Sequence, residues 1–75
     1  MTRLPVLSGR QVVRALEGLG YKEDHRTGSH IILRHDLPPH RRLTVPDHKA
    51  LAKGTLRAVI RQAGLTVEEF VDLVR

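Results

Sequence analysis

The sequence contains no cysteine and no tryptophan, and no uninterrupted apolar run is longer than three residues. Without cysteine the protein can form neither a disulfide framework nor a thiolate metal site, and a reducing compartment is the simplest interpretation. A membrane-spanning helix needs about 18 consecutive apolar residues, and the start of the chain lacks the apolar segment of a secretory signal. The sequence therefore predicts a soluble, cytoplasmic protein that is not secreted.

Aromatic residues are equally scarce, because Tyr21 and Phe70 are the only two in the chain. Phe70 falls on the apolar side of a predicted helix and is expected in the core. Proteins that bind splayed bases stack them on exposed aromatic rings, so this composition argues against a stacking platform. Any recognition of nucleic acid has to depend on phosphate, ribose and shape.

Positive charge is abundant and unevenly distributed. Thirteen Lys and Arg against eight Asp and Glu give a net charge of +5, and since residues 65–75 carry −2, residues 1–64 carry +7. A segment with this charge attracts polyanions, of which nucleic acid is the usual one. A basic stripe at four-residue spacing suits a phosphate backbone, a solvated helix face or an acidic partner protein. It consists of Lys49, Lys53, Arg57 and Arg61.

The helices of the predicted fold are marked by their caps. Ser8 with Gln11 forms a capping box, followed by apolar residues at helical spacing as far as Gly20. A second apolar stripe follows Gly54 and is interrupted at Gly64, after which Thr66 with Glu69 repeats the box and opens the last helix. We expect a helix over residues 8–20 and a broken helical segment over residues 55–74.

Between the helices the pattern changes to short runs separated by turn residues. Three strands are predicted, at about residues 21–25, 29–34 and 42–45, with apolar residues on one face and basic residues on the other. Asp47 is placed to cap a short helix that runs through Leu51. The chain length and globular composition leave room for one small domain over residues 1–75. We predict an α+β domain of order α-β-β-β-α, with the helices on one face of an antiparallel sheet.

Four of the five histidines fall at intervals of five residues, at His25, His30, His35 and His40. His-x4-His spacing occurs in one half of a zinc finger, but the cysteine half is missing here. On one strand a separation of five also places side chains on opposite faces. We therefore favour a role as polar hairpin residues for His35 and His40, and no metal site.

The segment from Arg26 to His30 is a better candidate for chemistry. Gly28 allows a tight turn and the close approach of a ligand backbone, and Arg26 adds a positive charge. His30 starts a predicted strand on its polar face, which Arg34 shares, and histidine titrates where a general acid or base must. Cleavage of RNA requires little more, because the 2′-hydroxyl supplies the nucleophile. The alternative is a hairpin corner with a polar residue after it.

These residues also resemble a known family. The order of Ser8-Gly9-Arg10, Gly28-Ser29-His30, Val45-Pro46-Asp47-His48 and Gly54-Thr55-Leu56-Arg57 is similar to that of the HicA (YcfA-like) toxins of prokaryotic toxin-antitoxin modules. The resemblance implies a small ribonuclease with a fold like that of double-stranded-RNA-binding domains. It further implies cleavage of mRNA without a metal or other cofactor, and inhibition by a HicB antitoxin.

The same resemblance assigns roles to single residues. The catalytic histidine of the family corresponds to His30, and Gly28 and Ser29 match its flanking motif. Pro46 and His48 match a second motif, for which we expect a structural function. Family members often carry an aromatic residue soon after the histidine, whereas this chain has Ile31, Ile32 and Leu33.

Our leading hypothesis is an endoribonuclease toxin with His30 as general base or acid and with Arg26, Gly28, Ser29 and Arg34 in contact with RNA. A non-catalytic module that binds double-stranded RNA by shape is the first alternative. A pure interaction subunit, whose basic surface holds an acidic partner protein, is the second.

Overall fold

The computed structural model describes residues 3–75, and two capping boxes fix where its first and last helices begin. Ser8 Oγ accepts a hydrogen bond from Gln11 N at 3.1 Å, and Gln11 Oε1 accepts one from Ser8 N at 2.8 Å. Helix α1 follows as Gly9–Glu17. Thr66 and Glu69 repeat the arrangement at 3.1 and 2.8 Å before α3, Val67–Val74. Both predicted boxes are confirmed.

The helices differ from the sequence prediction in three respects. Helix α1 stops at Glu17, and residues 18–20 form a tight turn in which Gly20 N donates to Glu17 O at 3.1 Å. Gly20, with φ +99°, then leads directly into the sheet. The helix expected after Asp47 is absent, because the Asp47 side chain is bonded to Arg26 and does not cap. Helix α2 begins at Lys53, two residues before the predicted segment, and runs to Gln62.

The sheet contains three antiparallel strands in the order β1-β2-β3, with bounds Tyr21–Thr27, His30–His35 and Arg42–Pro46. Each strand extends one or two residues beyond its predicted end. His30 pairs with Thr27 on β1 and with Pro46 on β3. The pairing of β1 with β2 is irregular between Glu23 and His25, so Asp24 is the extra residue of a β-bulge.

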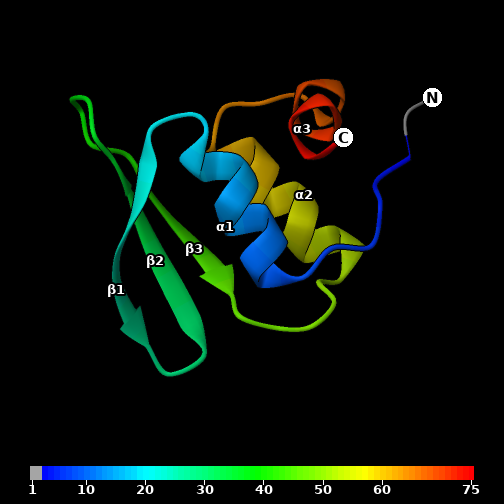
Figure 1. The fold of residues 1–75 in the computed structure, drawn as a ribbon, viewed down its shortest axis with the longest axis horizontal. Helices are drawn as coiled ribbons and strands as arrows, with labels where there is room; N and C mark the ends of the chain where they lie inside the picture. The colour runs from blue at the N-terminus through cyan, green and yellow to red at the C-terminus, as the bar shows by residue number, and fades with distance from the viewer. Residues whose placement is uncertain (1–2) are drawn as a thin grey trace.

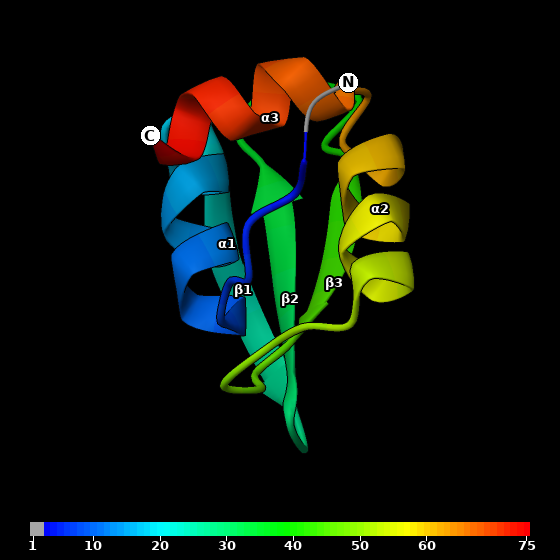
Figure 2. The ribbon, with the colours of Figure 1, turned by 90° about the vertical axis from the view of Figure 1, so that its right-hand side faces the viewer.

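The three helices lie on one side of this sheet, where α1 and α2 pack against the strands and α3 packs across α1 and α2 (Figures 1 and 2). That face contributes fully buried aliphatic side chains, and Phe70 of α3 is the largest of the fully buried side chains in the core. The chain changes direction between α2 and α3 at Gly64, whose φ is +76°. The α-β-β-β-α order with a broken final helix is thus confirmed.

The opposite face of the sheet is covered by no helix in the part of the chain that the structure describes. We call it the outer face. Within residues 3–75, none of the three helices has the length and apolar character needed to cross a membrane.

Candidate active site on the outer face

The strand register determines which side chains share the outer face. Directly opposed residues of antiparallel strands point to the same side, and Ile31 and Leu33 of β2 are fully buried beneath the helices. The neighbours of these two residues therefore point outward. Three rows across the sheet result: Thr27, His30 and Pro46; His25, Ile32 and Thr44; Lys22, Arg34 and Arg42.

His30 is held rigidly and is open to solvent. It follows the two-residue turn of Gly28 and Ser29, and it is hydrogen-bonded within the sheet between β1 and β3. Gly28 has φ +59°, and a Cβ at this position would meet no atom within 4 Å. The left-handed backbone conformation of the turn thus favours glycine, and the space at residue 28 is open. A ligand can reach the ring without a change in the fold.

Arg34 lies on the same face as His30, as the strand alternation predicts. Its opposed neighbours are Lys22 on β1 and Arg42 on β3, and all three are exposed. Three cationic side chains thus form a row across the sheet, four residues along β2 from His30. Such a row suits the phosphates of a nucleic acid backbone.

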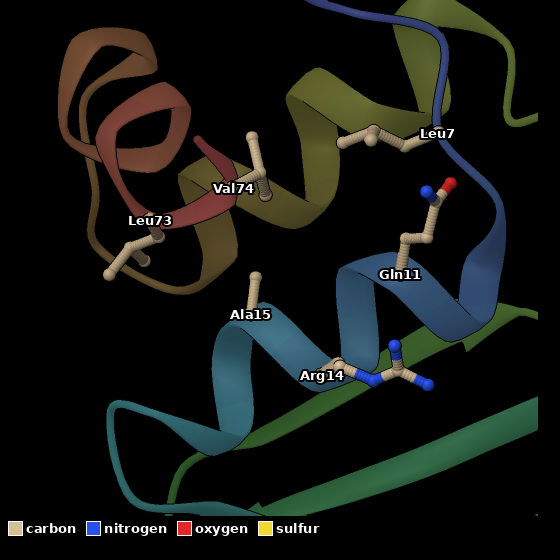
Figure 3. A pocket seen from close by; sticks show the side chains of 6 residues that line it. All are labelled: Leu7, Gln11, Arg14, Ala15, Leu73 and Val74. Atoms are coloured by element: carbon tan, nitrogen blue, oxygen red, sulfur yellow. The ribbon is translucent and has the colours of Figure 1, made fainter.

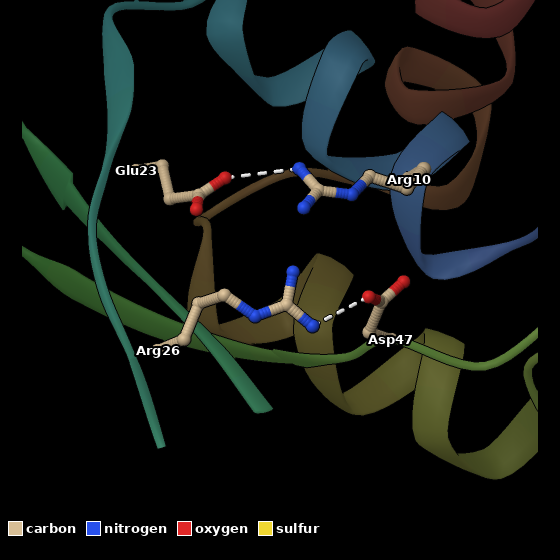
Figure 4. Close-up of polar contacts among 4 residues, drawn as sticks. All are labelled: Arg10, Glu23, Arg26 and Asp47. Carbon is tan, nitrogen blue, oxygen red and sulfur yellow. Dashed lines mark hydrogen bonds and ion pairs between the residues drawn. The ribbon is translucent and has the colours of Figure 1, made fainter. Parts of the chain in front are cut away.

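Arg26 is placed elsewhere. It is opposed to the fully buried Ile31 and so points toward the helices, where its Nη2 lies 2.6 Å from Asp47 Oδ2 (Figure 4). This hydrogen bond, supported by the charge of the guanidinium, holds the pKa of the Asp47 carboxyl below its usual value of 3.8. Arg10 and Glu23 form a similar pair nearby at 3.0 Å. The structure thus brings His30 and Arg34 to one face and Arg26 to the other.

The segment Pro46–His48 joins three parts of the fold. Asp47 N donates to Ser29 O at 2.7 Å, which ties the end of β3 to the turn before His30. Gly9 N, at the start of α1, donates to His48 O at 2.9 Å. These are backbone contacts, in agreement with the structural function expected for this motif.

Sequence reasoning missed a further pair on the outer face, formed by Asp24 and His25. Their side chains meet at 2.7 Å between Asp24 Oδ2 and His25 Nδ1. The hydrogen bond from His25 is the main cause that lowers the pKa of Asp24, and the charges of Arg42 and Arg34 act in the same direction. No signal in the sequence marks this pair, because consecutive residues of a regular strand point to opposite faces.

The remaining histidines of the five-residue series have structural contacts. His35 Nε2 donates to Leu19 O at 2.8 Å, its Nδ1 accepts from Leu37 N at 3.1 Å, and its ring packs edge-on against Tyr21. His40 lies in the following loop with φ +59°. Among residues 3–75, no three His, Asp or Glu side chains are grouped so that they could hold a metal ion.

Two other surfaces are separate from His30. Lys53, Arg57 and Arg61 are exposed on α2, in the helical layer, whereas Lys49 precedes that helix. A shallow pocket between α1 and α3 is lined mainly by apolar side chains (Figure 3). None of the predicted site residues lines this pocket.

The family model described as the HicA toxin of bacterial toxin-antitoxin matches residues 9–65. The match extends from the first residue of α1 to the residue after Gly64, and it includes every predicted site residue. No curated protein matches the chain.

Proposed function

The chain belongs to the HicA toxin family of bacterial toxin-antitoxin systems, and from this premise we propose that it is a metal-independent endoribonuclease that cleaves mRNA on its outer face. His30 is the catalytic histidine of this proposal. The observation that carries it is the position of the His30 ring, exposed on a sheet face that no helix of residues 3–75 covers (Figure 1). This is the position that a proton-transfer group needs to reach a long, bulky substrate.

The reaction requires three contributions from the protein. His30 removes the proton of the 2′-hydroxyl as that oxygen attacks the adjacent phosphorus. Arg34, with the cations beside it, holds phosphates of the RNA backbone about 13 Å along β2 from His30 and so positions the substrate. The turn of Gly28 and Ser29 gives the RNA backbone close access to the histidine. The bond from phosphorus to the 5′-oxygen breaks, which leaves a 2′,3′-cyclic phosphate and a 5′-hydroxyl.

Arg26 enters this proposal as a positioning residue. Its ion pair with Asp47, together with the bond from Asp47 N to Ser29 O, fixes the turn that precedes His30. Its guanidinium lies on the helix-facing side of the sheet, opposite to the outer face. We therefore assign the phosphate contacts to the row of Lys22, Arg34 and Arg42 on the outer face.

Membership of a toxin-antitoxin family implies an antitoxin partner. We propose a HicB-type protein that binds the toxin in the cytoplasm and prevents RNA from reaching the outer face. The net charge of +7 on residues 1–64 suits a partner with an acidic surface.

The test is the chemistry of the RNA ends after incubation with purified protein in excess EDTA. We expect cleaved RNA with 2′,3′-cyclic phosphate and 5′-hydroxyl ends, and no cleavage of the same sequence made with 2′-O-methyl ribose. Cleavage that stops in EDTA and returns with a divalent ion would contradict the proposal. RNA that stays intact while it binds in a salt-sensitive manner would instead support the non-catalytic RNA-binding module, which the row of three cations also suits.

A further inference from the structure

The β-bulge in β1 changes the face to which His25 points. Glu23 is opposed to Leu33 and points toward the helices, so in a regular strand His25 would point the same way. The extra residue, Asp24, shifts the alternation by one, and His25 is instead opposed to Ile32 on the outer face. Bulges of this kind re-aim side chains and are frequent beside active sites.

The bulge brings His25 next to His30. His30 lies two residues before Ile32 on β2, so the two histidines are diagonal neighbours on one face of an antiparallel pair. The Cα atoms of such neighbours lie about 7–8 Å apart. Two imidazole rings that extend from backbone positions at this separation can contact one phosphodiester linkage from two sides, through hydrogen bonds of about 3 Å.

Asp24 fixes how the His25 ring is presented. An ionised carboxylate only accepts hydrogen bonds, so the 2.7 Å contact requires a hydrogen on His25 Nδ1. The other nitrogen, Nε2, is then the one that exchanges protons with a ligand. A carboxylate in this position also compensates the charge of an imidazolium, as it does in catalytic triads. His30 has no carboxylate partner in the part of the chain that the structure describes.

We propose that His25 is the second catalytic residue of this ribonuclease, the general acid that protonates the leaving 5′-oxygen, and that Asp24 positions it. The inference rests on the proposed ribonuclease function. As the 2′-oxygen attacks phosphorus and loses its proton to His30, the bond to the 5′-oxygen breaks and that oxygen takes the proton from His25 Nε2. The attacking and leaving oxygens lie on opposite sides of phosphorus. Two separated histidines can therefore each exchange a proton with one of these oxygens. Water then returns a proton to His25 and removes one from His30.

The experiment uses an RNA oligonucleotide with sulfur in place of the bridging 5′-oxygen, at a linkage first mapped with the wild-type protein. A thiolate leaves without protonation, because thiols are far more acidic than alcohols, so a general acid is no longer needed. On the ordinary oligonucleotide we expect both His25→Ala and His30→Ala to be slower than wild type by at least about 100-fold. On the sulfur-containing one, His25→Ala should recover to within about tenfold of wild type, whereas His30→Ala should stay slow.

Asp24→Asn tests the positioning role. It keeps the His25 ring and removes the carboxylate charge, so we expect a smaller loss on ordinary RNA and recovery on the sulfur-containing RNA. The general-acid role is overturned if His25→Ala cleaves ordinary RNA at the wild-type rate, if it is equally slow on both substrates, or if His30→Ala is the variant that recovers. A wild-type protein that cleaves neither substrate overturns the ribonuclease function itself, which is a different result.

Discussion

The His30→Ala variant is expected to cleave RNA at least about 100-fold, and up to about 10,000-fold, more slowly than the wild-type protein. The substitution removes the ring that accepts the 2′-hydroxyl proton, and nothing in the fold depends on that ring, because it is exposed on the outer face. The loss should therefore appear in the catalytic rate while the thermal midpoint of unfolding stays close to the wild-type value. The measurement is single-turnover cleavage of a labelled oligonucleotide, with circular dichroism on the same samples.

His40→Asn is the matched control for this experiment. It also removes one imidazole, but from the loop after β2, where asparagine tolerates the positive φ of +59°. An asparagine amide can also donate to His35 O, which the His40 ring contacts through Nδ1 at 3.1 Å. Wild-type cleavage is expected from this variant. Equal cleavage by wild type and His30→Ala would remove His30 from the mechanism.

The Gly9→Ala variant is expected to be strongly destabilised. An added Cβ would lie 2.0 Å from Pro46 O and 3.1 Å from Asp47 Cα, so main-chain atoms would have to move. Overpacking of this kind costs about 1–3 kcal/mol and occasionally more. A domain of this size has only roughly 4–11 kcal/mol of stability in total. We expect a cost of about 3 kcal/mol, which corresponds to a fall of roughly 10–25 °C in the unfolding midpoint.

Gly54→Ala is the control for that prediction, because it makes the same chemical change in α2. A Cβ at Gly54 would meet no atom within 4 Å, and alanine favours a helix over glycine by up to about 1 kcal/mol. Its unfolding midpoint should equal or exceed that of the wild type. A Gly9→Ala protein as stable as Gly54→Ala would contradict the tight contact between α1 and the segment after β3.

Much of the fold was predictable because local signals and the global arrangement agree. The two capping boxes place the first and last helices, and the alternation along β2 places Ile31 and Leu33 inside and His30 and Arg34 outside. The prediction of a helix after Asp47 was wrong because of a tertiary contact. A capping residue was present, but an arginine distant in the sequence binds its carboxylate.

The relative positions of site residues were predictable only where the residues lie on the same strand. Arg26 and His30 lie on different strands, so their relative position depends on the two-residue turn at Gly28 and Ser29, which pairs Thr27 with His30. That turn sets Arg26 opposite the buried Ile31. The outward position of His25 was not predictable in this way, because a bulge depends on tertiary pairing and the residues around Asp24 give no local signal for one.

The central claim, that RNA is bound and cleaved on the outer face, is tested most directly by NMR titration with an uncleavable 2′-O-methyl oligonucleotide. We predict the largest chemical-shift changes at outward-pointing residues of the sheet. These are Lys22, His25, Thr27, His30, Arg34 and Thr44. Shift changes confined to Lys53, Arg57 and Arg61 of α2, with the His30 resonances unmoved, would contradict it.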